Sequence, residues 1–187
     1  MLTSSYRPSA GRFLVSEPFM HDENFQRSVV LLVEHNENGS LGFVMNRQLK
    51  VKINEVVDGL PEFNAPVFVG GPVERSTLHF VHRLGEQLDG SHQIAEDLYW
   101  AGDFSKLKEM ILMGQAEPQD ILFFVGYSGW GPGQLETELE RKSWIVAPEN
   151  SSFVFQEDYT DLWREILQGM GEKYRIISNY PVDPRMN

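Results

Sequence analysis

Short apolar runs bounded by turn residues recur along the chain and predict a series of β-strands. Residues 28–33 and 120–125 have the continuous apolar character of strands that are buried on both faces. An Asn38-Gly39 pair separates the first run from another at 41–45, and this pair predicts a hairpin turn. We therefore expect an antiparallel pair near the centre of a sheet. Further strands are predicted at 13–15, 66–69, 77–81, 94–100, 144–147 and 153–155.

Apolar side chains spaced three and four residues apart predict helices between these strands. Asp103 is placed to cap a helix that ends at Gly114, and a short helical segment is predicted at 53–60. The clearest helix lies near the C-terminus, where glycines at 169 and 171 offer a stop. Its apolar stripe consists of Leu162, Trp163, Ile166, Leu167 and Met170.

The order of these elements decides the predicted fold class. Strands neither alternate strictly with helices nor gather in one half of the chain, which argues against a doubly wound parallel fold. We predict an α+β fold, with a single compact domain over residues 1–187 that has a mixed, largely antiparallel β-sheet and flanking helices. The length of 187 residues suits one well-buried core.

Composition narrows the function classes. The net charge of −11 repels phosphate backbones and anionic membranes, so direct nucleic-acid binding is disfavoured. The absence of cysteine excludes disulfides, zinc thiolate sites and thiol nucleophiles. The N-terminus lacks an apolar signal region, and no stretch reaches the roughly 18 apolar residues that span a bilayer. We therefore expect a cytoplasmic protein without a membrane segment.

The segment Gly-Tyr-Ser-Gly-Trp-Gly-Pro-Gly-Gln-Leu at 126–135 is the most unusual in the chain. It follows a predicted strand, and Pro132 suits the first turn of a helix, so a glycine turn between strand and helix is expected. Backbone N–H groups from Gly129 to Gln134 would then face an anion. In the alternative interpretation, the glycines supply positive φ angles and close packing while Trp130 fills the core or a neighbouring groove.

Two other segments invite a binding role. Gly70-Gly71-Pro72 follows a predicted strand, and it could line one cleft with the first glycine segment if both leave the sheet on the same side. As a turn, however, it needs no ligand. Arg47 follows the second strand of the predicted hairpin, at the end of the hairpin that lies away from Glu34-His35. The planar guanidinium group of an arginine suits an anion, although an arginine in such a place more commonly forms an exposed ion pair.

Familiar catalytic patterns are not met. Gly126-Tyr-Ser-Gly-Trp130 resembles a nucleophile elbow around Ser128, but the elbow requires glycine where Trp130 stands, and all five histidines lie upstream. The segment also lacks the Gly-Lys-Ser/Thr ending of a phosphate-binding loop. His79 and His82 point to opposite faces of a predicted strand, so they do not share a metal. We predict no catalytic residue, no metal site and no cofactor.

Four ordered blocks of the sequence resemble the YqgE/AlgH family of bacterial proteins. The resemblance implies a single α+β domain in the cytoplasm, with no agreed biochemical activity. Some relatives are labelled transcriptional regulators, but that label names no residue that could be carried over. Relatives have alanine where Ser128 stands and proline where Gln48 stands. The blocks are 11–15 with 25–35, 39–47, 69–73 and 126–136.

Together these patterns favour a non-enzymatic regulatory or adaptor protein that binds a small anionic ligand or a cytoplasmic protein partner. Any effect on transcription would act through a protein, because the acidic chain repels DNA. The alternative is an enzyme that acts on a small metabolite in a cleft lined by both glycine segments, and a homo-oligomer also remains open. The predicted ligand or partner surface comprises Arg47, Gly70, Gly71, Gly129, Trp130, Gly131, Gly133 and Gln134.

Overall fold

The computed structural model describes residues 6–182, so residues 1–5 and 183–187 of the predicted domain lie outside the described part. Its strands are β1 Phe13–Ser16, β2 Val29–Asn36, β3 Gly39–Val44, β4 Val67–Val69, β5 Val73–His82, β6 His92–Ala95, β7 Leu98–Trp100, β8 Ile121–Trp130 and β9 Trp144–Ala147. Its helices are α1 Ile53–Val56, α2 Phe104–Leu112, α3 Gln134–Glu140, α4 Ser151–Val154, α5 Leu162–Gly169 and α6 Glu172–Ser178. Single 3₁₀ turns span Gly85–Gln87 and Pro118–Asp120.

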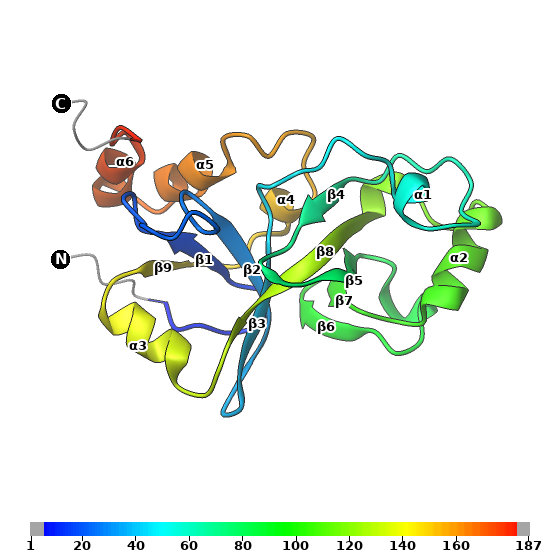
Figure 1. Ribbon diagram of the computed structural model, residues 1–187, viewed down its shortest axis with the longest axis horizontal. Coiled ribbons are helices and arrows are strands. Elements are labelled where there is room, and N and C mark those ends of the chain that lie inside the picture. Colours follow the sequence, from blue (N-terminus) through cyan, green and yellow to red (C-terminus); the bar gives the residue numbers. More distant parts are fainter. Residues whose placement is uncertain (1–5, 183–187) are drawn as a thin grey trace.

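The strands form one nine-stranded sheet, in the order β6-β7-β5-β8-β3-β2-β1-β9, with β4 beside β8 (Figure 1). Neighbouring strands are antiparallel except β4 and β8, which are parallel. The predicted mixed, largely antiparallel α+β fold is therefore confirmed. The predicted hairpin is also present, because β2 and β3 pair from Val30 with Val44 to Asn36 with Gly39.

Strand β8 connects two halves of the sheet. Residues 121–125 pair with β4 and β5, whereas residues 128–130 pair with β3. We call the first group, with β6 and β7, the β5 half, and the second group, with β1, β2 and β9, the β3 half. Figure 1 shows them on the right and left, with β8 crossing between them.

Gly126 lies where β8 passes from one half to the other, and its φ is +69°. Side chains of a strand alternate between faces, but Phe124 and Tyr127, three residues apart, both contact the largest core cluster. The backbone at Gly126 thus resets the alternation, at the point where the pairing of β8 with β5 is interrupted between Val125 and Tyr127. The reset lets Trp130 face a different core cluster under α3.

The core has one cluster that runs through both halves and two that are confined to one half each. In the shared cluster, the ring of Phe43 stacks on Phe124 at 4.7 Å, and Phe124 stacks on Phe68 at 5.5 Å. Helix α5 covers this cluster, and its Trp163 indole donates a hydrogen bond of 2.9 Å to the carbonyl of Ser16. The confined clusters lie under α2 in the β5 half and under α3 in the β3 half.

The local predictions were right for most elements and wrong for a few. Helix α2 begins after Asp103, whose carboxylate accepts hydrogen bonds from the N–H groups of Ser105 and Lys106, as predicted. Residues 126–130, predicted as a turn, continue strand β8, and the next helix begins at Gln134 rather than at Pro132.

Two other assignments differ from the sequence pattern. The predicted strand at 153–155 lies in and after helix α4, because the Asn150 side chain accepts from the N–H of Ser152 and starts a helical turn. The predicted strand at 94–100 is two strands, β6 and β7, that turn at Asp97 with φ of +54°. Helix α6 was not predicted.

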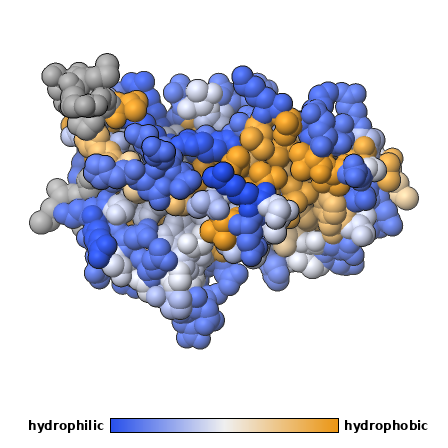
Figure 2. Space-filling view, viewed as in Figure 1, coloured by the Kyte–Doolittle hydropathy of each residue, from blue (hydrophilic) through white to orange (hydrophobic). Residues whose placement is uncertain are grey.

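The surfaces of the two halves differ. Figure 2 shows an apolar area over α1 and β4 in the β5 half, beside a largely polar surface over the β3 half. Val51 and Val56 are exposed in this part of the chain, and Leu49, Val57 and Leu60 are half-buried. Over residues 6–182, no helix is long and apolar enough to cross a membrane.

Candidate functional site

The predicted centre of the binding surface, Trp130, is a core residue. Only 6% of it is exposed, and its ring lies 5.8 Å from that of Trp144 and 6.3 Å from that of Phe25. Both indole N–H groups donate to the same carboxylate oxygen of Glu138, at 2.9 Å from Trp130 and 2.8 Å from Trp144. Trp130 therefore fills the core, which is the alternative that the sequence left open.

The loop after Trp130 satisfies its own polar groups. The N–H of Gly131, predicted to face an anion, donates to the side-chain oxygen of Gln134 at 2.9 Å. The Gln134 amide in turn donates to Glu138 at 3.0 Å. Gly129 and Gly133 are exposed and line none of the cavities described below. A ligand or partner role for this part of the predicted surface therefore remains a prediction.

The two glycine segments pack directly against each other. A Cβ atom on Gly71 would overlap the carbonyl of Tyr127, and one on Gly70 would overlap that of Gly126. The hydroxyl of Ser128, which is fully buried, donates to the carbonyl of Gly70 at 3.0 Å. In the described part of the chain, the cleft expected between the segments is thus filled by their own backbones, and Ser128 is not placed as a nucleophile.

Arg47 does line a cavity, and two other arginines share it. This arginine cavity has a volume of about 300 Å³ and lies between the ends of β2 and β3 on one side and helices α5 and α6 on the other. Trp130 pairs with Ser40 near the start of β3, so the structure places Arg47 away from the loop at 129–134. The lining residues include Arg27, Arg47, Asn46, Thr160, Asp161, Trp163, Arg164 and Asn179.

Backbone and ring contacts hold the three guanidinium groups in place. Arg27 lies 4.6 Å from the centre of the Trp163 ring and donates to the carbonyls of Tyr180 and Pro181 at 2.6 and 2.7 Å. Its Nε is buried and has no hydrogen-bond partner. Arg164 donates to the Asn179 side chain at 2.6 Å.

Arg47 is fixed from the hairpin side. It donates to the carbonyl of Gln26 and, at 3.3 Å, to that of Asn46. The Asn46 side chain spans the same strands, because it donates to the Arg27 carbonyl at 2.8 Å and accepts from the N–H of Val29 at 3.0 Å. Arg27 itself has φ of +49°, a conformation that few non-glycine residues adopt. The hairpin end is thus built around these two arginines.

The cavity concentrates positive charge in an acidic protein. Within residues 6–182, no carboxylate lies within 4.0 Å of the guanidinium nitrogens of Arg27, Arg47 or Arg164. Burial and the nearby charge of Arg164 lower the pKa of Arg27, and burial lowers the pKa of Arg47. The cavity therefore holds three guanidinium groups against one carboxylate, that of Asp161, and a bound anion would relieve the remaining repulsion.

Arg47 also lines a second cavity of about 220 Å³, which brings it together with Gly71. Val69 and Pro72 supply apolar walls there, and Arg75 and Glu23 supply charges of opposite sign. Two of the predicted surface residues therefore meet at one place.

Arg27 and Arg164 were not predicted from the sequence, because isolated arginines in distant segments carry no local signal.

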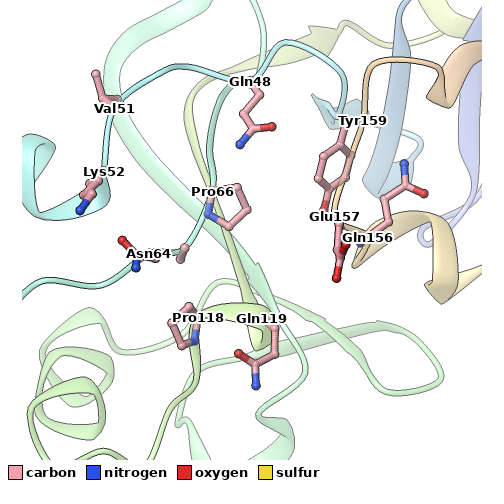
Figure 3. A pocket seen from close by; sticks show the side chains of 11 residues that line it. Gln48, Val51, Lys52, Asn64, Pro66, Pro118, Gln119, Gln156, Glu157 and Tyr159 are labelled. Carbon is pink, nitrogen blue, oxygen red and sulfur yellow. Dashed lines mark hydrogen bonds between the residues drawn. The ribbon is translucent and has the colours of Figure 1, made fainter.

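A third cavity, of about 430 Å³, is lined by neutral polar and apolar side chains together with Lys52 and Glu157 (Figure 3). Gln48 points into it from one side, and Asn64 and Gln119 line it with two prolines. Burial raises the pKa of Tyr159 to about 12, and its hydroxyl donates to the carbonyl of Val154 at 2.7 Å. Tyr159 is therefore a neutral structural group at physiological pH rather than a base.

No group of three or more histidine, aspartate or glutamate side chains in residues 6–182 is arranged to hold a metal ion. His79 and His82 lie three positions apart in strand β5, the arrangement that the sequence predicted. The arginine cavity is thus the place where charged side chains converge most strongly in the part of the chain described.

Comparison with known proteins places the chain in a family. It belongs to the AlgH-like family, whose model matches residues 13–175. A UPF0301 protein of Cytophaga hutchinsonii is 46% identical over 178 residues, which cover 95% of this chain and 98% of the relative.

Two solved structures share the fold. The solution structure of the AlgH protein from Pseudomonas aeruginosa has a TM-score of 0.73 at 27% identity, and the match covers 96% of this chain and 98% of that one. The crystal structure of a Corynebacterium diphtheriae protein has a TM-score of 0.79 at 25% identity, with 94% of each chain covered. The family resemblance and the fold agree, and the function of the family is not known from these matches.

Proposed function

We propose that this protein binds a small anion in the arginine cavity and acts as a non-enzymatic regulatory or adaptor protein. The observation that carries the proposal is the convergence of Arg27, Arg47 and Arg164 on one cavity, with no carboxylate in ion-pair range among residues 6–182. In a chain of net charge −11, such a group favours one small anion over a polyanion, which the rest of the surface repels.

The chemistry of the cavity suits a carboxylate or a phosphate ester. Arginine presents a planar fork of donors that matches both groups. Part of the charge serves the fold, because Arg27 donates to the carbonyls of Tyr180 and Pro181 and Arg164 to the side chain of Asn179, just after α6. Arg47 serves the fold from the hairpin side, through the carbonyls of Gln26 and Asn46. The charges of Arg27 and Arg164 oppose each other, and a bound anion would offset this repulsion.

Binding without a chemical step is the simplest reading of these side chains. Guanidinium groups stay protonated in proteins, so they orient and neutralise an anion but do not transfer protons. Thr160 and Asn179 can supplement them with neutral donors. We therefore propose a sensor of a metabolite, whose occupancy alters the surface formed by the β2–β3 hairpin end and α6.

Thermal unfolding tests this proposal. The purified protein is titrated with inorganic phosphate, citrate and sugar phosphates, with sodium chloride keeping the ionic strength constant. A ligand at about 100 times its Kd adds about 2.7 kcal/mol and should raise Tm by about 5–10 °C for a chain of this size.

Matched variants locate the effect. Arg164→Gln and Arg47→Gln should each remove most of the ligand-induced shift, whereas Arg141→Gln, at the exposed end of α3, should retain it. The proposal is wrong if no anion stabilises the protein beyond the salt control. It is also wrong if both cavity variants keep the full shift.

A further inference from the structure

A cavity of about 360 Å³ lies at the open end of β7, on the edge of the β5 half, and it is distinct from the arginine cavity. It is lined mainly by rings and backbone: Leu78, His79, Phe80, Trp100, Ala101, Gly102 and Phe104. We propose that this ring cavity binds a planar heteroaromatic group of a small molecule, such as a nucleobase or a flavin-type ring.

The walls of the ring cavity are aromatic on two sides. Phe104 packs against Phe80, with ring centres 6.0 Å apart. Trp100 belongs to a different group of rings, because its nearest ring partners are His92 at 5.8 Å and Phe43 at 6.4 Å. Trp100 and Phe104 are both half-buried, so each leaves apolar ring surface facing solvent. A flat ring placed in the cavity would cover this surface and stack on it.

The sheet edge supplies polar groups beside these rings. Strand β7 pairs with β5 only at Val81 and His82, and the N–H of Ala101 then donates to the carbonyl of Phe80 at 3.1 Å. In an antiparallel strand, every second residue turns its N–H and C=O groups to the same side. Leu78 is two residues from Phe80, so its backbone N–H and C=O point to the side of β7, beyond the residue where β7 ends. A neighbouring N–H and C=O match the edge of a heteroaromatic ring, which carries both donors and acceptors.

The floor of the cavity is held in an uncommon backbone conformation. Ala101 has φ of +63° and Gly102 has φ of +132°. The buried His82 accepts the N–H of Leu84 on Nδ1, so its Nε2–H donates to the Ala101 carbonyl at 2.9 Å and fixes the turn. Non-glycine residues at positive φ are uncommon and gather at ligand sites. The cavity is thus shaped by a rigid turn rather than by a loose loop.

His79 adds an uncharged polar group. The hydroxyl of Thr77 donates to the carbonyl of Glu74 at 2.8 Å, so the 2.9 Å contact between Thr77 Oγ1 and His79 Nε2 has the histidine as donor. Nδ1 is then an acceptor. Neutral rings, one neutral histidine and backbone groups favour an uncharged planar ligand group over an ion.

The four tryptophans provide a direct test by NMR. The indole N–H groups of Trp130, Trp144 and Trp163 are hydrogen-bonded inside the core. Only Trp100 lines the ring cavity. Titration of the ¹⁵N-labelled protein with adenosine, guanosine or riboflavin, none of which carries a charge for the arginine cavity, should therefore shift one indole signal in a saturable way. The other three signals should stay in place.

Variants and controls decide the outcome. Phe104→Leu keeps an apolar side chain but removes one ring, so it should weaken binding by about tenfold or more, since one aromatic stack is worth about 1–3 kcal/mol. Phe153→Leu, a half-buried phenyl on another surface, should leave the affinity unchanged. The proposal fails if no planar probe moves the Trp100 signal at millimolar concentration. It also fails if cyclohexanol moves that signal as strongly as the planar probes, or if Phe104→Leu binds with wild-type affinity.

Discussion

The β3 half and the β5 half share one sheet but cover it differently. In the β3 half, α3 packs on one face and α5 with α6 on the other, and the surface is largely polar (Figures 1 and 2). In the β5 half, α2 and the four-residue α1 leave several apolar side chains half-buried. The arginine cavity of the first half is lined by charged side chains, whereas the ring cavity of the second is lined by aromatic ones. The helices contribute to this difference, because α5 supplies Arg164 to the first cavity and α2 supplies Phe104 to the second.

The contact between the two glycine segments joins the two halves of the sheet. We expect its disruption to lower the free energy of unfolding more than any other change considered below. Gly71→Ala places a methyl group inside the Tyr127 carbonyl, which neither backbone can avoid without moving. We expect a loss of about 3 kcal/mol or more in the free energy of unfolding, at the upper end of overpacking effects. Urea unfolding measures this loss.

Gly169→Ala is the matched control, because a Cβ there meets no atom within 4 Å. Gly169 ends helix α5, so alanine should change stability by less than about 1 kcal/mol. Native-state hydrogen exchange extends the test to the comparison itself. If the junction couples the halves, Gly71→Ala lowers protection in β2 and in β5 together, whereas loss confined to one half would show that they unfold independently.

These glycines also show how far the sequence could be read. Runs of apolar residues located most of the strands, and the Asn38-Gly39 pair located the hairpin, because those signals act over a few residues. The continuation of β8 past Gly126 was missed, since the partner that pairs with residues 128–130 is a strand far back in the chain. Close packing around the glycines at 126–133 was one of the two interpretations of that segment. The sequence could not show which backbone they pack against, because that depends on how the strands pair in the folded sheet.

The candidate site was predictable only in part for the same reason. Arg47 was identified from its place at a strand end, and its cavity exists. Arg27 and Arg164 come from separate segments and meet only after α5 packs on the sheet. Trp130 was a candidate for a binding surface, because its glycine neighbours suggested a loop, and the core was the other interpretation. The change in side-chain alternation at Gly126 turns it into the core.

Replacement of Glu138 should destabilise the β3 half alone, so it separates the stability of the two halves. Its carboxylate accepts from the indoles of Trp130 and Trp144, and both are buried. Glu138→Leu leaves two buried donors without an acceptor, and we expect a loss of about 2 kcal/mol or more, since each unsatisfied group costs about 1–3 kcal/mol. Chemical unfolding followed by tryptophan fluorescence measures it. Glu140→Leu, on the exposed face of the same helix, should stay within about 0.5 kcal/mol of wild type, and equal losses in the two variants would refute the role of Glu138.

His82 should make the stability of the β5 half depend on pH, with the smallest effect of the three. Burial lowers the pKa of His82 below its ordinary value of 6.5, although the hydrogen bond to Ala101 opposes this shift. As the pH falls below about 6.5, the unfolded chain takes up a proton that the folded chain resists, so the free energy of unfolding falls. Burial shifts the pKa of His79 in the same direction.

The expected slope between pH 7.5 and 5.5 is at most about 1.4 kcal/mol per pH unit for each histidine, and no loss from these groups is expected above the unfolded pKa. Urea unfolding at several pH values in this range gives the slope. His82→Gln should flatten it, whereas His92→Gln, which changes an exposed histidine, should not. Hydrogen exchange of the Leu84 amide, which donates to His82 Nδ1, locates the effect in the β5 half. If the free energy of unfolding does not change between pH 7.5 and 5.5, the folded chain takes up a proton on His82 as readily as the unfolded chain does. The turn at Ala101 must then be held by a contact other than the hydrogen bond from His82.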